Sequence, residues 1–448
     1  MGNELNEPIL EKKSFDLETD YLKFGVSSIQ GWKSQMEDYN FYSIDLIPNT
    51  NKKIDIFGIF DGHGGPEIAK YISSNFLKIF LSNNFFKEGK YIESLKETFK
   101  EIDKSLNTDK VKQELIKISE EFKLSEKEEI IEINKTCSND EKLTENEIEQ
   151  IKCLKNILNP RNLMNYNISS FSGCAGIVIL IINDKIYIAS AGNCRCIPID
   201  ENWEVIKDKT NKLHYINDDI EKTRINNSQS FKEKQFYPEL LLSSRGFGDF
   251  EYKENKWLKL EDQAVSPDPE VIELNYEECK FLIIGSHGLF EDSKDVKSYN
   301  KNNQDITDYF MEEIKNNKNK KISKIIEEYF DMNIPKDKKD EQNQSYMDNI
   351  TCFVIQLYDR PKFVEDKKEE AKNEKEEENR RMANFQKKGK DASNRSMKDL
   401  FSFFTNNHRS KSMIKEKEKE KEKDKEKEKE KKLENSISIR NLLRKKNK

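Results

Sequence analysis

The chain has 448 residues, room for two or three average domains, but 36% of them are charged and only 35% are hydrophobic. The last 88 residues hold 29 basic and 19 acidic side chains, so they carry about +10 while the first 360 residues carry about −16. This acidic body argues against an enzyme that attracts nucleic acid with a general positive field. The longest strongly apolar run, 175–182, is shorter than the roughly 18 residues that cross a bilayer.

The seven cysteines are widely separated and show no His/Cys spacing typical of a zinc site. An odd number of dispersed cysteines, with no apolar secretory signal at the N-terminus, is typical of free thiols in a reducing compartment. We therefore expect a soluble monomer of the cytoplasm or nucleus that does not bind nucleic acid. Membrane contact is expected only if Gly2 is myristoylated, for which Asn6 is not the favoured residue.

The folded body is predicted over residues 22–358, where short apolar runs alternate with amphipathic segments. Residues 54–60 predict a buried strand, the following Asp-Gly-His-Gly-Gly sequence a tight turn, and residues 66–80 a helix. Residues 176–182 and 186–191 flank an Asn-Asp turn and predict a β-hairpin. Further strands are predicted at 281–284 and 350–358. Such runs of strands and helices favour an α+β sandwich over a doubly wound parallel sheet.

Charged segments suggest how the chain is divided. An N-terminal segment, 1–21, precedes the body, 22–360, in which the stretch 104–170 is rich in Lys, Glu and Asn and predicts a solvated helical insertion. The remaining residues, 361–448, form a low-complexity tail. Within 415–432 Lys alternates with an acid, which places like charges at i,i+4, so we expect disorder or a marginal helix. Polar loops are predicted at 315–321 and 335–344.

Carboxylates stand beside turns in three distant places, each next to a predicted strand: Glu37 with Asp38, Asp61, and Asp348. Taken singly, each acid is most simply a turn or cap residue. Together they suggest a site for Mg²⁺ or Mn²⁺, because these cations prefer carboxylate, carbonyl and water oxygens. Gly62 follows one of these acids, and its flexible backbone could direct a carbonyl into the same site.

Eight short segments follow one another along the body: GWKSQMEDYNF (31–41), FGIFDGHGG (57–65), SGCAGIVILI (172–181), SAGNCR (190–195), LSSRGFGDFEYK (242–253), VSPDPEV (265–271), FLIIGSHGLFED (281–292) and MDNIT (347–351). In these segments the chain resembles the metal-dependent serine/threonine protein phosphatases of type 2C, also called PPM-type phosphatases. The resemblance implies an α+β fold with a central β-sandwich of two antiparallel sheets flanked by helices. It also implies phosphorylated proteins as substrates.

The resemblance further implies a centre of two Mn²⁺ or Mg²⁺ ions at one edge of the sandwich. Asp61 would bridge the two ions, and Glu37 and the carbonyl of Gly62 would hold the second. Asp348 would hold the first ion. Water would then attack phosphorus directly, without a phosphoenzyme.

Two further roles follow from the same resemblance. His63 matches the general acid that protonates the departing Ser or Thr oxygen, a task suited to an imidazole near neutral pH. Asp38 would orient water beside the metal ions. We interpret Asp249, in the segment resembling the family's SRAxGD sequence, as a structural residue that anchors a loop through backbone hydrogen bonds, rather than as a metal ligand.

Three departures from the family pattern bear on activity. Lys33 replaces an arginine, which keeps a positive charge near the phosphate but loses the planar fork that grips two oxygens. His287 replaces a carboxylate expected on the first ion, and Glu291 stands for a neighbouring Asp. Asn193 replaces an Asp that, together with the residue now His287, would help to hold a third ion, so no third metal site is expected.

His287 leaves two interpretations open. As a ligand, its imidazole would shift the preference of the centre toward ions such as Mn²⁺; as an ordinary turn residue, it would indicate a decayed site. We interpret the chain as a protein Ser/Thr phosphatase with reduced or Mn²⁺-dependent activity. The alternative is a catalytically inactive pseudophosphatase that binds phosphoproteins or acts as a scaffold.

Overall fold

The computed structural model describes residues 4–47, 53–136, 168–228, 243–290, 296–337 and 344–359, which belong to one compact unit, Met1–Phe363. Side chains are described in all of these except 123–136, 296–297 and 344–345. Gly2, Glu291 and the tail 361–448, for which predictions were made, lie outside the described residues. Residues 137–167 of the predicted insertion also lie outside them.

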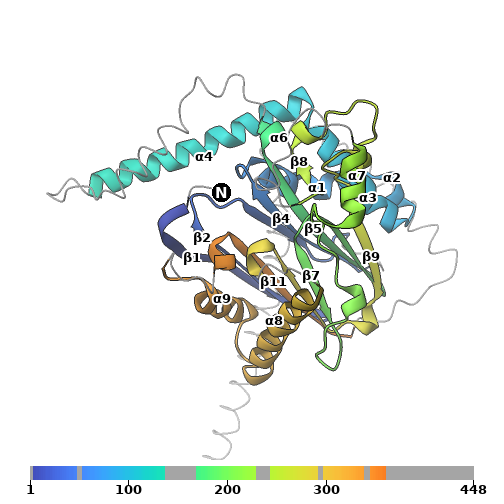
Figure 1. The fold of residues 1–448 in the computed structure, drawn as a ribbon. Helices are drawn as coiled ribbons and strands as arrows, with labels where there is room; N and C mark the ends of the chain where they lie inside the picture. The colour runs from blue at the N-terminus through green and yellow to red at the C-terminus, as the bar shows by residue number, and fades with distance from the viewer. Residues whose placement is uncertain are drawn as a thin grey trace, which may run out of the picture. The chain divides into compact units, whose positions relative to one another are not determined.

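Two antiparallel sheets form the centre of this unit (Figure 1). The first has the order β1-β2-β11-β10-β7, from strands Glu4–Glu18, Leu22–Lys33, Ile350–Leu357, Phe281–Gly285 and Arg195–Ile199. The second has the order β3-β4-β5-β6-β9, from Asp38–Ser43, Ile54–His63, Gly173–Ile182, Lys185–Ala191 and Glu270–Asn275, and a short β8, Phe247–Gly248, pairs with β5. The predicted fold class, an α+β sandwich of two antiparallel sheets, is confirmed.

Helices lie against both sheets (Figure 1). Their bounds are α1 Glu67–Ser82, α2 Asn84–Lys87, α3 Tyr91–Leu106, α4 Asp109–Thr136, α6 Ile168–Phe171, α7 Asp219–Asn227, α8 Val296–Asn316 and α9 Ile322–Asn333. The helices α1 and α3 contact the second sheet, whereas α8 and α9 contact the first. None of the helices in the described ranges is both long and apolar enough to cross a bilayer.

The strands predicted around the central hairpin are present, but the turn predicted at residues 61–65 is shorter than expected. The strand predicted at 54–60 is the start of β4, which continues to His63, and the helix predicted from Pro66 is α1. The predicted hairpin is β5 and β6, with Ile182 opposite Lys185. These elements were predictable because their apolar runs are buried on both faces and are interrupted only at turns.

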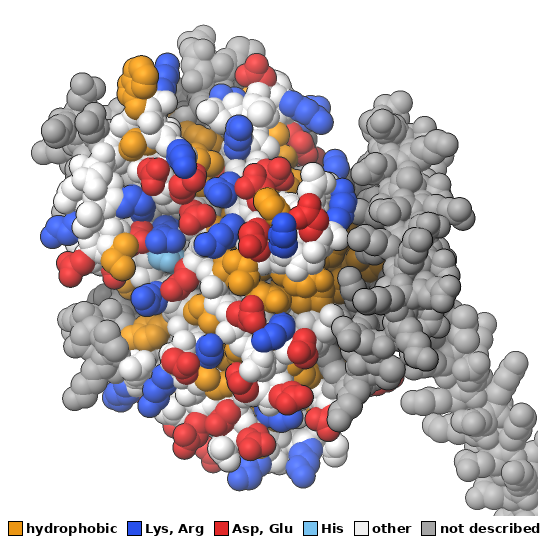
Figure 2. Space-filling model, turned by 90° about the vertical axis from the view of Figure 1, so that its right-hand side faces the viewer, with side chains coloured by type: hydrophobic (Ala, Val, Ile, Leu, Met, Phe, Trp, Pro, Cys, Tyr) orange, Lys and Arg blue, Asp and Glu red, His pale blue; other side chains and the backbone are white. Residues whose placement is uncertain are grey.

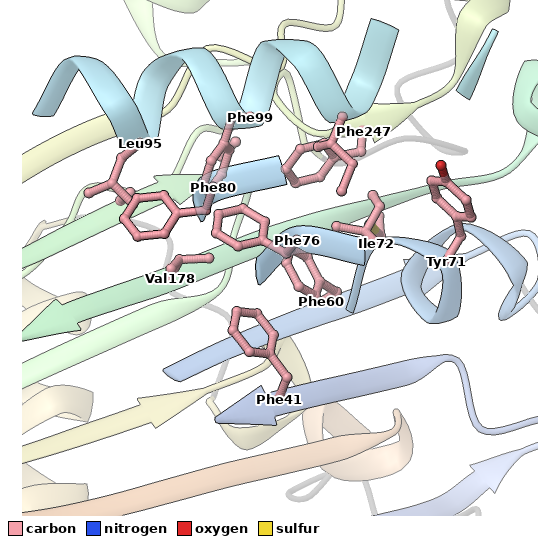
Figure 3. Close-up of a cluster of buried hydrophobic side chains, with 14 of the residues drawn as sticks. Phe41, Phe60, Tyr71, Ile72, Phe76, Phe80, Leu95, Phe99, Val178 and Phe247 are labelled. Atoms are coloured by element: carbon pink, nitrogen blue, oxygen red, sulfur yellow. The ribbon is translucent and has the colours of Figure 1, made fainter. Parts of the chain in front are cut away.

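A layer of aromatic side chains between the second sheet and the helices α1 and α3 holds two segments that carry polar residues (Figure 3). Phe60, just before Asp61, lies 5.9 Å from Phe247 between ring centroids, and Phe247 lies 5.0 Å from Phe99 of α3. Phe247 is close in sequence to Asp249. Because interiors are closely packed, this contact fixes the ends of β4 and β8 relative to each other.

Two elements differ from the sequence prediction. The strand β1 pairs with β2 along the edge of the first sheet, although the folded body was expected to begin near Leu22. Its charged side chains obscure the strand pattern, since an edge strand exposes much of its surface. In α4, Val111 and Leu115 are buried, so the predicted insertion begins inside the core and not as a wholly solvated helix.

A fully buried ion pair joins α3 to the segment that follows β8. Asp103 Oδ1 lies 2.8 Å from Lys253 Nζ and also accepts a hydrogen bond of 2.8 Å from the N–H of Gly248. Lys253 donates a second bond to the carbonyl of Gly246 at 3.0 Å. The pair therefore anchors both ends of residues 246–253 to the helix layer.

We predict that Lys253→Met lowers the free energy of unfolding by about 3–5 kcal/mol, because it leaves the Asp103 carboxylate buried without a counter-ion. Adding Asp103→Asn should recover more than half of the loss, since the amide can still accept from Gly248. Urea unfolding followed by tryptophan fluorescence measures both. Equal stability of the wild type and Lys253→Met would contradict the role given to this pair.

Candidate active site

Three of the predicted acids meet at the ends of β3 and β4. Asp38 and Asp61 are direct partners in the register of these antiparallel strands, so their side chains point to the same face. The N–H of Gly62 donates to the carbonyl of Glu37 at 3.2 Å. A Cβ on Gly62 would lie 2.6 Å from that carbonyl oxygen, so only glycine allows β4 to approach Glu37 this closely.

The first sheet brings the remaining predicted residues to the same place. The N–H of His287, just after β10, donates to Asp61 Oδ2 at 2.8 Å. Gly288 packs beside Asp348, whose Cβ would be 3.1 Å from a Cβ on that glycine. Acids from three distant segments of the sequence are thus brought together. Asn193, the third departure from the family pattern, lies in the turn between β6 and β7.

Asn349 connects these segments, although the sequence analysis gave it no role. Its side-chain oxygen accepts the N–H of Glu37 at 2.8 Å, and its side-chain nitrogen donates to the carbonyl of Gln30 at 2.8 Å. Its own N–H donates to Asp348 Oδ1 at 2.8 Å. Because Asn349 is buried, it orients Glu37 and Asp348 relative to each other. Its place beside Asp348 in the segment MDNIT was the only signal in the sequence.

The acids are held in an environment that disfavours their charged forms. Burial raises the pKa of Glu37 to about 7, even though Gly65 donates its N–H to the carboxylate at 2.6 Å. Burial and the neighbouring charge of Asp61 raise the pKa of Asp38 well above its usual range. The pKa of Asp61 is raised as well, by loss of solvent and by the charge of Asp348. Mutual repulsion of this kind marks a site where a cation would be stabilising.

Lys33 is the positive side chain that meets these acids directly. Its Nζ lies 3.0 Å from Asp348 Oδ1. Burial lowers the pKa of Lys33, but the carboxylates of Asp348, Glu37 and Asp61 outweigh that effect and raise it. Lys33 was predicted to lie near the substrate phosphate; in the structure its ammonium contacts Asp348, a predicted ligand of the first ion.

The acids fit a divalent cation, but their oxygens are partly engaged by protein groups. Asp348 repels Glu37, Asp38 and Asp61. Lys33 and the rings of His63 and His287 act against this repulsion. Asp38 is 4% exposed, and neither of its oxygens accepts a well-aligned hydrogen bond, although the hydroxyls of Ser286 and Thr351 lie close by. A buried carboxylate in this state calls for a cation or a proton.

In the described part of the chain, no three His, Cys, Asp or Glu side chains form a complete ligand set for a metal ion. The hydrogen bonds explain why. Glu37 accepts from Gly65, Asp61 accepts from His287, and Asp348 pairs with Lys33. Metal binding would therefore exchange these contacts for ligand bonds.

His63, at the end of β4, contacts Asp249. Its Nε2 lies 2.8 and 3.0 Å from the two carboxylate oxygens of Asp249. The backbone of Asp249 does anchor a loop, since its N–H donates to the carbonyl of Ser172 at 3.0 Å, but its side chain contacts the predicted general acid. Spacing in the sequence could not reveal this pairing, because the two residues are 186 positions apart.

His287 lies close enough to Asp61 to affect it through both backbone and ring. The ring lowers the pKa of Asp61, and the backbone N–H contributes in the same direction. The imidazole therefore supplies part of the positive charge that faces Asp61.

Comparison with known proteins shows the family to which the chain belongs. The chain matches the sequence profile of the family described as protein phosphatase 2C over residues 22–121 and 119–340. It is 29% identical to "Probable protein phosphatase 2C 2" of Paramecium tetraurelia over 65% of this chain and 80% of that protein. It is also 29% identical to "Probable protein phosphatase 2C 21" of Arabidopsis thaliana over 80% of this chain and 93% of that protein.

Among solved structures, a phosphatase from Toxoplasma gondii superposes on the chain with a TM-score of 0.49 and 16% identity, covering 80% of this chain and 98% of that one. The family assignment rests on the sequence matches, which cover most of the folded body. They confirm the resemblance drawn from the eight segments. The chain belongs to the protein phosphatase 2C family of protein serine/threonine phosphatases.

Proposed function

We propose that this chain hydrolyses phosphoserine and phosphothreonine in proteins at the site formed by Glu37, Asp38, Asp61, His63 and Asp348. The observation that carries the proposal is the convergence of the four acids from three distant segments beside a histidine that is partly open to solvent. Members of the family generally depend on Mn²⁺ or Mg²⁺. The residues at the site suit these hard cations.

Two ions form part of the proposal. Asp61 would contact both, and Glu37 and the Gly62 carbonyl would hold the second. Asp348 would hold the first, in competition with Lys33 at 3.0 Å. When bound, the ions would neutralise phosphoryl oxygens and make water more acidic. A third ion is not proposed, because Asn193 and His287 stand where acids would be needed.

The protein groups act on the substrate around these ions. Lys33 offers a positive charge to a phosphate oxygen, although its single ammonium cannot grip two oxygens as a guanidinium does. Asp38 accepts a hydrogen bond from the attacking water and orients it. His63 donates a proton to the Ser or Thr oxygen as it leaves.

We predict that Asp61→Asn lowers kcat on a phosphothreonine peptide on the order of 100-fold or more, because the only acid in contact with both proposed ions loses its charge. A metal chelator should abolish the activity of the wild type, and excess Mn²⁺ should restore it. Phosphate release measures both effects. Asp262→Asn, a change of the same kind on a surface turn, serves as the control.

The same assay distinguishes the proposed enzyme from the alternative, a pseudophosphatase that only binds phosphoproteins. It requires that wild type and Asp61→Asn release phosphate equally slowly in Mn²⁺, in Mg²⁺ and in chelator. That outcome would contradict the proposed reaction.

We also predict that His287→Asp binds the first ion about tenfold more tightly and turns over faster, because a carboxylate restores one negative charge to that side of the site. Calorimetric titration with Mn²⁺ and Mg²⁺ measures the affinity. His287→Asn is the matched variant, since it shortens the side chain without adding charge, and it should show no gain. Unchanged affinity in His287→Asp would show that position 287 does not face the first ion.

A further inference from the structure

The contact between His63 and Asp249 is the feature of the site that the proposed function leaves without a role. The two oxygens of Asp249 lie 2.8 and 3.0 Å from His63 Nε2, so both oxygens of the carboxylate are within hydrogen-bond distance of the same ring nitrogen. The Asp249 side chain is 4% exposed, whereas that of His63 is 38% exposed. A buried carboxylate therefore holds Nε2 of a ring that is partly exposed to solvent.

The backbone fixes Asp249 in place for this contact. Its φ of 50° and ψ of 43° lie in the left-handed region, which non-glycine residues seldom adopt without support from their surroundings. Support comes from the bond between its N–H and the carbonyl of Ser172. Its carboxylate also occupies the space above Gly173, where any Cβ would collide with Oδ2.

Gly173 has a second significance, because it is the partner of His63 in the register of β4 and β5. A side chain across from His63 would ordinarily fill this position. Its absence lets the carboxylate of Asp249 enter from β8 and the turn after it, and approach the imidazole. The buried pair of Asp103 and Lys253 then secures that turn to α3.

We propose that Asp249 is the positioning residue of the general acid: it accepts the Nε2 proton of His63 in a hydrogen bond, so that Nδ1 carries the proton that is transferred. This inference rests on the proposed function of His63. A carboxylate behind a histidine fixes the tautomer and stabilises the imidazolium, as in other hydrolases. Without it, the ring could rotate or present the wrong nitrogen.

The reaction step then balances without a change of tautomer. The oxygen of water bonds to phosphorus, and the bond from phosphorus to the Ser or Thr oxygen breaks, leaving its electron pair on that oxygen. The oxygen takes the proton from His63 Nδ1, which leaves a neutral ring whose Nε2–H still donates a hydrogen bond to Asp249. The proton lost by the attacking water passes to solvent, and solvent returns one to Nδ1.

The test compares two leaving groups. An alkyl oxygen, as in a phosphothreonine peptide, needs a proton to leave, whereas a nitrophenolate leaves readily without one. We expect Asp249→Asn to lower kcat on the peptide about 10- to 100-fold but to change kcat on p-nitrophenyl phosphate less than about threefold. His63→Gln should show the same selectivity with a larger loss.

Asp262→Asn, the same change at an exposed carboxylate away from His63, is the matched control. It should leave both rates unchanged. If Asp249→Asn also lowers both rates equally while His63→Gln remains selective, the inference about Asp249 is wrong and the proposed acid stands. If His63→Gln is itself unselective, the proposed acid is wrong, and the role of Asp249 falls with it.

A second measurement does not depend on activity or on metal. The chain has four histidines, so ¹⁵N spectra of the imidazole rings resolve His63 with the aid of His63→Gln. The neutral ring should carry its proton on Nε2 in the wild type, and Asp249→Asn should shift it toward a mixture of the two tautomers. A wild-type ring protonated on Nδ1 would overturn the inference, and so would a tautomer unaffected by the substitution.

Discussion

Repulsion among carboxylates is the constraint around which this fold is organised. Asp38 and Asp61 face the same side of two adjacent strands, and Asp348, just before β11 of the other sheet, adds a third charge. A site with this much negative charge in partly dehydrated surroundings is unstable by itself, so its neighbours must hold it together. Lys33, the N–H of His287 and the side chain of Asn349 meet part of that need. They leave Asp38 without a well-aligned hydrogen bond, so its buried carboxylate still favours a proton or a cation nearby.

The apolar core makes this arrangement possible by fixing strand ends from both sides. Phe60 and Phe247, packed in the layer of Figure 3, hold the segments that carry Asp61 and Asp249. Glycines at 62 and 173 then let polar groups approach where a Cβ would collide. Function here depends on rigid placement, because a shift of about 1 Å at such a site can lower the rate on the order of 100-fold. Figure 2 shows that acidic and basic side chains are interspersed on one face of the described residues, as suits an enzyme that does not rely on a broad positive field.

How much of the structure could be predicted from the sequence depends on how far apart in the chain the interacting residues lie. The apolar run before Asp61 and the glycines after it are local signals. They predicted the start of β4 and the position of α1 correctly, but β4 continues to His63, so the turn is shorter than predicted. The convergence of Asp61 with Asp348 was suggested by acids beside predicted strands, and the family resemblance gave each acid its role, since no local pattern encodes a contact between sheets. The pairing of His63 with Asp249 and the contact of Lys33 with Asp348 were missed for the same reason. The strand β1 was missed because its outward charges hide its alternation.

The most direct test of this account is a calorimetric titration of the full chain with Mn²⁺ near pH 7 in two buffers of different ionisation enthalpy. Acids whose pKa has been raised, Glu37 to about 7 among them, must lose protons when a cation binds. The account predicts two ions per chain and a binding heat that changes with the buffer, both weakened by Asp61→Asn. No binding at millimolar Mn²⁺, or binding that Asp61→Asn leaves unchanged, would contradict it.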